Sequence, residues 1–357
     1  MLKLGKPPVD LTLTAAYIKS LQRPDGAILW NTNDKLDPWD HVEAAMGLTV
    51  AGCFEQAQQA YAWLANNQLN DGSWHATYFL PANPTYLQKS QAHTGKETNF
   101  IAYVATGVWH YFLATEDHAF LARYYSVIEQ ALNFVLRFQA SSGDISWPVD
   151  QQNQPQNDAL LTACCSIARS LECGILAAKV LAKPHAKWQL AYLKLSSAIL
   201  TKPHRFDRTW ESKQRFAMDW YYPILAGLYT PTQAQAQLKK RWQEFVEPTL
   251  GCRCVSDEPW VTMAETCELV MALIHANHIK QANALFATLA QWQQADGGFV
   301  TGYVFTDKTI WPSDKTSWTA GAVLLAADAL YHLTPAATLF TQTSHLFCHI
   351  QPKAHST

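Results

Sequence analysis

Acidic residues at the starts of predicted helices are the side chains in this sequence best suited to catalysis. Asp219 precedes three aromatic residues at the start of an apolar helix, and Glu265 has small and apolar neighbours in another. A carboxyl group buried in such surroundings has a raised pKa, the property that a general acid needs. Cleavage of a glycosidic bond requires one such acid and one carboxylate that acts as base or nucleophile. We therefore predict Asp219 and Glu265 as a catalytic pair, with Glu97 and Glu258 in reserve.

Each of these acids also has a structural interpretation that the sequence leaves open. A glutamate early in a helix, such as Glu97, stabilises the positive end of the helix dipole. Glu265 would have a structural role if it paired with a neighbouring Arg or Lys. Glu258 precedes a proline, which holds its backbone extended and places it on a loop.

Tryptophan is abundant, with 14 among 357 residues, and most of the 14 fall on long loops or on the helix turns that follow them. An indole offers a broad apolar face and one N–H donor. Such faces stack on sugar rings, and they also stabilise carbocations by cation–π attraction. Aromatic side chains that merely fill the wide end of a helical ring would be distributed in the same way. The predicted substrate-binding residues are Trp39, Asp40, His41, Asn99, Trp74, Trp220, Tyr221, Asp257, Trp260, Trp311 and Trp318.

The elements that would position these residues are almost all helices. Apolar residues at three- and four-residue spacing predict twelve of them. A short β-hairpin arm near 298–305 is the one exception. The predicted helices span about 10–22, 37–52, 54–68, 93–115, 117–139, 157–180, 185–199, 215–230, 232–247, 260–277, 279–294 and 315–333.

Very short and long links alternate between the predicted helices. Short links produce antiparallel helix hairpins, and long loops in a compact domain are usually functional. The even-numbered helices are apolar on several faces, as expected for buried helices, whereas the odd-numbered ones carry a polar stripe. We therefore predict an all-α fold, an (α/α)6 toroid of six hairpins with its pocket at the N-termini of the inner helices. It would form one domain over 1–357, with the ring at about 10–333 and a tail at 334–357.

A repeat supports this arrangement. Four segments share the pattern Gln-x-x-Asp-Gly, with Ser in place of Asp in one of them, and an aromatic residue follows each: 22–26, 68–72, 139–143 and 293–297. Glycine supplies the positive φ that ends a helix, and Asp initiates a turn. The same stop signal after four odd-numbered helices indicates repeated hairpins.

The repeat resembles the QW-type repeat of terpenoid cyclase and protein prenyltransferase toroids. It is also similar to loop signals in six-hairpin glycosidases, which share the (α/α)6 ring. The resemblance implies this fold, and either isoprenoid or carbohydrate chemistry. The cyclase acid motif Asp-x-Asp-Asp is absent, since Asp37 and Asp40 have a different spacing. Cys252 and Cys254 lie near Asp257 but have no suitably placed His, so we predict no metal site.

Composition excludes several other classes. A net charge of −2 argues against a nucleic-acid surface. No apolar run is long enough for a membrane span, and the start of the chain lacks the apolar core of a signal peptide. Eight cysteines, four of them on apolar helical patterns, favour a reducing, cytoplasmic compartment. Phosphate-binding glycine loops and nucleophile elbows are missing, so no cofactor is expected.

The sequence thus favours a cytoplasmic, glycosidase-like enzyme that acts on a small-molecule or oligosaccharide substrate through carboxylates in a Trp-lined pocket. Two alternatives stay open: a prenyltransferase- or terpenoid-cyclase-like protein that handles an isoprenoid, and a non-catalytic glycan-binding toroid. The oligomeric state cannot be derived from the sequence.

Overall fold

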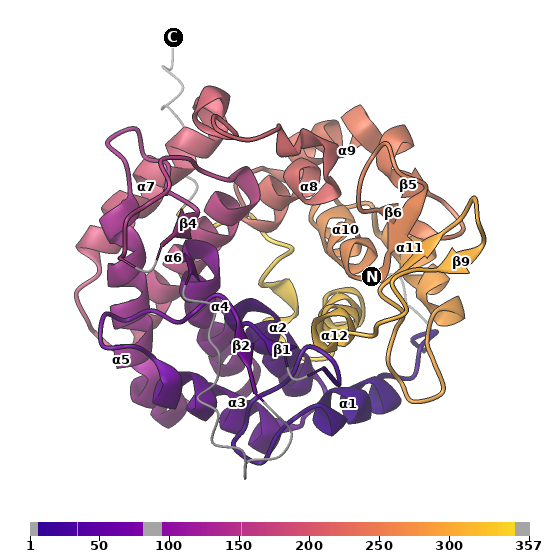
Figure 1. The fold of residues 1–357 in the computed structure, drawn as a ribbon, viewed down its shortest axis with the longest axis horizontal. Coiled ribbons are helices and arrows are strands. Elements are labelled where there is room, and N and C mark those ends of the chain that lie inside the picture. Colours follow the sequence, from indigo (N-terminus) through magenta and orange to yellow (C-terminus); the bar gives the residue numbers. More distant parts are fainter. Residues whose placement is uncertain (1–5, 34, 81–94, 151, 347–357) are drawn as a thin grey trace.

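A closed double ring of helices forms the molecule (Figure 1). The computed structural model describes residues 6–33, 35–80, 95–150 and 152–346. In this part of the chain the inner helices are α2 (Pro38–Val50), α4 (Thr98–Thr115), α6 (Leu161–Val180), α8 (Ala217–Leu225), α10 (Met263–His275) and α12 (Ser317–Tyr331). The outer helices are α1 (Leu11–Ser20), α3 (Phe54–Asn67), α5 (His118–Val135), α7 (Ala186–Thr201), α9 (Pro231–Phe245) and α11 (Ile279–Ala287). Each inner helix contacts the next, and α12 contacts α2, which confirms the (α/α)6 toroid.

Inner helices are enclosed by protein on nearly all sides. Every residue of α2 is buried, whereas α5 buries one apolar face and exposes the other. Helix α6 is long and apolar enough to cross a membrane by length and composition alone. However, 83% of its apolar window is buried inside the ring, as expected for a core helix of a toroid.

The link lengths place the site at one face of the ring. Short links at 51–53, 116–117, 181–185, 226–230 and 276–278 connect each inner helix to the outer helix that follows it. Long segments lead into the N-termini of the inner helices, so these N-termini and the long loops share one face. The first turn of α2 is fixed by its cap, because Asp37 Oδ1 accepts a hydrogen bond from the backbone N–H of Asp40 at 2.9 Å.

The Gln-x-x-Asp-Gly repeats join neighbouring outer helices. The Gln139 side-chain amide donates to the carbonyl oxygen of Gly143 at 3.0 Å and to that of Ala191 in α7 at 2.9 Å. Gln22 and Gln68 make the same two kinds of bond, and reach α3 and α5. Gln293 reaches the first turn of α1. We call this contact the latch; it repeats around most of the outer ring.

The glycine of the latch permits this close approach. Gly143 has φ of 105°, and a Cβ atom there would lie 2.3 Å from the carbonyl oxygen of Lys194 in α7. The other three repeat glycines also have positive φ and a backbone carbonyl of the next outer helix within 2.4 Å of a built Cβ. No larger residue fits a latch without moving the neighbouring helix.

Small antiparallel sheets complete the loop face. Two are two-stranded: β1 (Lys35–Leu36) with β2 (Tyr78–Phe79), and β3 (Lys96–Glu97) with β4 (Pro148–Val149). The third contains β5 (Val246–Glu247), β6 (Gly251–Arg253), β7 (Trp260–Thr262), β8 (Gly302–Val304) and β9 (Thr309–Ile310). The predicted hairpin arm is confirmed by the pairing of β8 with β9. The other strands were not predicted, because two or three residues are too few to show alternation.

The described part of the tail covers the other end of the ring. Its short 3₁₀ helix spans Pro335–Thr338. The Arg169 guanidinium on α6 donates to the carbonyl oxygens of Leu225 and Gln342, and Ser344 donates to the buried Glu172 carboxylate. These bonds hold the tail beneath the inner helices. The predicted division into a ring at 10–333 and a tail at 334–357 stays a prediction.

The latch predicts a difference between two glycine substitutions. Gly143→Ala should destabilise the fold by about 3 kcal/mol, because it adds a backbone clash to the cost of a positive φ. Gly52→Ala is the matched control: φ is 73° there, and nothing lies within 4 Å of a built Cβ. It should cost about 1 kcal/mol. Urea unfolding of both variants measures the difference, and equal losses would show that the latch contact is not needed for stability.

Candidate active site

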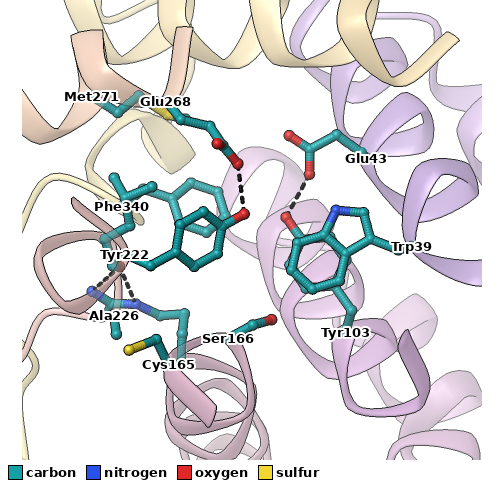
Figure 2. Close-up of a pocket in the computed structure, with 12 residues that line it drawn as sticks. Trp39, Glu43, Tyr103, Cys165, Ser166, Tyr222, Ala226, Glu268, Met271 and Phe340 are labelled. Atoms are coloured by element: carbon teal, nitrogen blue, oxygen red, sulfur yellow. Dashed lines mark hydrogen bonds between the residues drawn. The ribbon is translucent and has the colours of Figure 1, made fainter. Parts of the chain in front are cut away.

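A narrow cavity lies among the inner helices, between Trp39 and the tail. Its volume is about 20 Å³, which is room for about one water molecule. Five inner helices and the tail supply its walls (Figure 2). The lining residues are Trp39, Glu43, Tyr103, Cys165, Ser166, Arg169, Tyr222, Leu225, Ala226, Glu268, Met271 and Phe340.

Two carboxyl–phenol pairs form the deep part of this cavity. Tyr103 on α4 donates to Glu43 Oε2 on α2 at 2.5 Å, and Tyr222 on α8 donates to Glu268 Oε1 on α10 at 2.5 Å. Figure 2 shows the two pairs facing each other across the cavity. Tyr221 donates to the second oxygen of Glu268, also at 2.5 Å. Both oxygens of the Glu268 carboxyl group are therefore occupied.

Burial controls the charge of these two acids. It raises the pKa of Glu43 to about 7, against a smaller opposing effect of the Tyr103 hydrogen bond. Burial, and next the charge of Glu265, raise the pKa of Glu268 well above its usual value. Burial therefore favours the neutral, protonated form of both acids in the deep part of the cavity.

Trp39 forms the wall between this deep part and the loops. Its ring stacks on Tyr103 with centroids 4.3 Å apart and planes 9° apart, and it also contacts Phe100 and Tyr222. The side chain lies at the second residue of α2, directly after the long loop 21–37. Trp39 thus lines the cavity, and its predicted role in substrate binding stays a prediction.

Further carboxyl groups stand where the long loops meet the inner helices, a place that we call the mouth. Asp40 is buried, and its Oδ2 has no hydrogen-bond partner among the described residues. Burial, and next the charge of Asp37, raise the pKa of Asp40 well above its usual value. Burial also raises the pKa of Asp37 to about 6 and that of Glu97 to about 7. Trp147 donates its indole N–H to Glu97 Oε2 at 3.1 Å.

Two more predicted residues lie at the mouth. Asn99, at the start of α4, is buried, and its Oδ1 has no hydrogen-bond partner within the described chain. Glu265, in the first turn of α10, accepts a hydrogen bond from the Cys254 thiol at 3.3 Å. Since α2 and α10 both pack against α12, Asp40 and Glu265 project from two helices that flank the same neighbour.

The structure does not bring Asp219 and Glu265 into one cavity, which corrects the predicted pairing. Asp219 faces a separate pocket of about 210 Å³ between the starts of α6 and α8, which Leu161 and Asp207 also line. Its Oδ1 has no partner in the described part of the protein, and burial, then the charge of Asp207, raise its pKa to about 7. Asp219 has the raised pKa that was predicted for it, but Glu265 does not line the same pocket.

Four predicted binding residues are occupied by packing inside the protein. His41 and Trp74 lie towards α3, where the His41 ring nitrogens contact Ile28 N and Ala60 O, and the Trp74 indole donates to Leu64 O. Trp220 stacks on Phe245 of α9 and donates to Gln237 O. Tyr221 donates to Glu268 from behind the cavity lining. Their predicted place at the pocket wall is wrong, because helix periodicity turns each of them towards a neighbouring helix.

A third set of predicted site residues lies on the outer rim of the loop face. Glu258 and Asp257 are exposed and pair with Arg215. Trp260 and Trp311 contact each other in an open groove beside the five-stranded sheet. Trp318 is partly buried in the first turn of α12. Glu258 lines this groove and lies outside the central cavity.

Several residues that line the cavity were not predicted from the sequence. Glu43 follows Trp39 by four residues, Tyr103 follows Asn99 by four, and Glu268 follows Glu265 by three. Residues at these spacings share one helix face, so the signal was present once the helix starts were chosen. Among the described residues, no three His, Cys, Asp or Glu side chains are arranged to hold a metal ion.

The fold and the acid- and tryptophan-lined cavity together define a glycosidase-like (α/α)6 toroid. Solved structures support that class: a glycosidase with a TM-score of 0.70 and 14% identity covers 92% of this chain and 98% of its own. A D-mannose isomerase (TM-score 0.66, 11% identity, 90% and 95% coverage) and a sugar epimerase from a ruminal bacterium (TM-score 0.64, 13% identity, 88% and 95% coverage) share the fold. No family model matches the chain.

A protein with a similar sequence shows which family within this class the chain belongs to. The MMP endo-(1,4)-3-O-methyl-α-D-mannosidase of Mycolicibacterium hassiacum is 40% identical over 334 residues, which cover 93% of this chain and 89% of that protein. The chain belongs to the family of this endo-mannosidase. It is a glycoside hydrolase-like enzyme, and the glycosidase prediction is confirmed over the isoprenoid alternative.

The raised pKa of Glu43 predicts how stability depends on pH. The unfolded group titrates near 4.5 and the folded group near 7, so its contribution is present below pH 4.5 and is lost as the pH rises through 7. Relative to Glu43→Gln, the wild type should lose about 3 kcal/mol between pH 4 and pH 8. Urea unfolding at both pH values tests this, with Glu55→Gln on the surface of α3 as control. A pH-independent difference would show that Glu43 titrates normally.

Proposed function

We propose that this enzyme hydrolyses internal (1→4) bonds in chains of 3-O-methyl-α-D-mannose. The main support is the 40% identity to an endo-mannosidase named for that bond, which extends over nearly the full length of both proteins. The observation that carries the mechanism is the buried Asp40 carboxyl group at the mouth, with an oxygen that no described residue occupies.

Asp40 has the features of a general acid. Burial raises its pKa, which favours the protonated form, and its Oδ2 has no hydrogen-bond partner among the described residues and can therefore carry that proton towards a substrate. We propose that it protonates the glycosidic oxygen as the bond from this oxygen to C1 breaks. The leaving sugar departs as an alcohol, and the positive charge that develops on the sugar ring must be met by a second carboxylate.

Glu265 is the proposed second carboxylate. It stands in the first turn of α10, where its carboxyl group accepts a hydrogen bond from the Cys254 thiol, a weak donor. As a base it would take a proton from the water that attacks C1, and as a nucleophile it would attack C1 itself. Both routes end with a hydroxyl group on C1. When Glu265 acts as base, the water proton goes to Glu265, and proton exchange with solvent then reprotonates Asp40 and deprotonates Glu265. When Glu265 acts as nucleophile, Asp40 takes the proton of the water that hydrolyses the sugar–Glu265 ester, and Glu265 leaves as a carboxylate.

The size of the cavity supports a reaction at the mouth. A volume of about 20 Å³ cannot hold a sugar ring, so a sugar would bind above Glu43 and Glu268. There it would meet the edge of Trp39 and the free Oδ1 of Asn99. An indole and an amide are side chains that bind the apolar face and the hydroxyl groups of a sugar.

Asp219 is a second candidate for the general acid. Its pKa is raised to about 7, and its Oδ1 is free among the described residues. It would require the scissile bond to lie on the α6–α8 side of the ring rather than beside α2. Substitution distinguishes the two positions.

We also propose that the enzyme works in the cytoplasm. The seven cysteines in the described chain are all free thiols, and five of them are buried at inner helices or at β6: Cys164, Cys165, Cys173, Cys252 and Cys267. Free thiols in this number are typical of a reducing compartment. The oligosaccharide substrate is the one partner that we propose.

Substitution of the two proposed catalytic residues tests the mechanism. Asp40→Asn and Glu265→Gln should each lower kcat on a (1→4)-linked 3-O-methyl-α-mannose oligosaccharide by about a thousandfold, because each removes one arm of acid–base catalysis. Thermal unfolding should show that both variants are folded. Asp219→Asn is the matched comparison; if it abolishes turnover while Asp40→Asn does not, Asp219 is the acid.

A substrate with a better leaving group distinguishes the role of Asp40 as acid from that of Glu265 as base or nucleophile. An aryl glycoside with an acidic phenol needs no proton to depart, so Asp40→Asn should recover most of its activity on such a substrate. Glu265→Gln should stay inactive on it, because the charge at C1 is still unmet. Equal recovery in both variants would contradict the assignment of acid and base.

A further inference from the structure

An open groove on the loop face has no part in the mechanism proposed above. It encloses about 550 Å³, within the size range of ligand pockets. The turn before β7, the β8–β9 hairpin and the segment before α8 form its walls. Its lining includes Phe216, Glu258, Trp260, Thr306, Asp307 and Trp311.

Trp311 is the most conspicuous residue of this groove. Its side chain is 58% exposed, and among the described tryptophans it alone falls in the exposed class. An exposed indole leaves a large apolar face in water, which is unfavourable unless a ligand covers it. Ile310 beside it is also exposed, which widens the uncovered apolar surface.

The two tryptophans are held in place. Trp260 donates its indole N–H to the backbone oxygen of Trp311 at 2.6 Å, and the two rings lie 5.3 Å apart at 65°. A Cβ atom on Gly302 would lie 2.2 Å from Trp260 Nε1, so glycine makes room for this indole. The aromatic surface is thus pre-arranged, which reduces the entropy lost on binding.

Polar groups border the aromatic surface. On one side, the Arg215 guanidinium donates to Asp257 at 3.0 Å and lies 3.8 Å from the Glu258 carboxylate. On another side, Thr306 and Asp307 form part of the turn that joins β8 to β9, and the Thr306 hydroxyl donates to Asp307. An apolar platform beside carboxylates and hydroxyl groups is the combination that binds a sugar: the ring face stacks, and the hydroxyl groups are hydrogen-bonded. An O-methyl group would add to the apolar contact.

The wall of the groove is hydrogen-bonded to the segment that contacts the proposed catalytic carboxylate. Phe216 and Val255 pair as a β-bridge in its wall, and the carbonyl oxygen of Cys254 accepts from Ala217 N at 2.9 Å. The thiol of the same Cys254 bonds to Glu265. One residue, Cys254, therefore separates the groove from the proposed catalytic carboxylate.

We propose that this groove is a distal subsite that binds further sugar units of the same oligosaccharide chain, with Trp311 as its stacking platform. The proposal rests on the proposed function, since it assumes a chain that extends past the cleaved bond. An enzyme that cuts within a chain has sugar units on both sides of that bond, and the groove accommodates those on the Glu265 side.

Two substrate lengths test the subsite. The probes are the shortest (1→4)-linked 3-O-methyl-α-mannose oligosaccharide that the wild type cleaves and one several units longer. Trp311→Ala should reduce the preference for the longer chain, measured as the ratio of kcat/KM values, by about tenfold, mainly through KM. Trp311→Phe keeps a platform and should restore most of the ratio. Leu190→Ala, which removes an exposed apolar side chain on α7, is the control and should change neither value.

The outcomes separate this proposal from the proposed function. If the wild type cleaves no (1→4)-linked 3-O-methyl-α-mannose oligosaccharide of any length, no probe pair exists and the proposed function fails. If the wild type cleaves both and Trp311→Ala changes both equally, or changes neither, the distal subsite is overturned. A change in self-association on Trp311→Ala with unchanged kinetics would likewise overturn it and identify a protein-binding surface. Calorimetric titration of Asp40→Asn with the longer chain, with and without Trp311→Ala, should show the same tenfold loss as a change in Kd.

Discussion

The inner helices are enclosed on nearly every side, and this enclosure is the constraint on which the site depends. A polar side chain on such a helix has no access to bulk water, so it must find a partner inside the ring or lose its charge. Glu268 does both: two tyrosines bond to it, and burial raises its pKa. Glu43 follows the same pattern with one tyrosine. The chemistry of the cavity is therefore a consequence of the double ring that surrounds it.

Closure of the ring in turn depends on the outer helices. The four latch glycines bring neighbouring outer helices into backbone contact, and the Gln139 side chain, as one example, donates both to its own turn and to a carbonyl oxygen of the next outer helix. The latch repeats between α11, α1, α3, α5 and α7. The five-stranded sheet lies in the remaining sector, near α9 and α11 (Figure 1). The proposed distal groove is built on this sheet, where the repeat gives way to loops free to form a binding surface.

The sequence predicted the fold closely and the site only in part. Helix periodicity and link lengths predicted all twelve described helices, and the repeat glycines marked four helix ends. They also placed Trp39, Asp40, Asn99 and Glu265 near the starts of inner helices, where the structure has them. They did not predict which way the other side chains point, because a rotation of one residue turns a side chain by about 100°. For that reason Trp220 and His41 were assigned to the pocket although they face α9 and α3, while Glu43 and Tyr103 were missed.

Several buried acids could hold a proton, and their hydrogen bonds distinguish a catalytic acid from a structural one. A general acid must give its proton to the substrate, so at least one of its oxygens must be free to approach the substrate. Glu268 fails this test, because both oxygens accept phenol hydroxyls, and it lies deep in a space of about 20 Å³. Glu43 has one engaged oxygen and lies equally deep. Asp40 Oδ2 is buried and has no hydrogen-bond partner among the described residues, although the Asp40 carboxyl group also interacts with that of Asp37. The cap bond uses the backbone N–H of Asp40. The cap holds the residue in place and leaves the acid available for reaction.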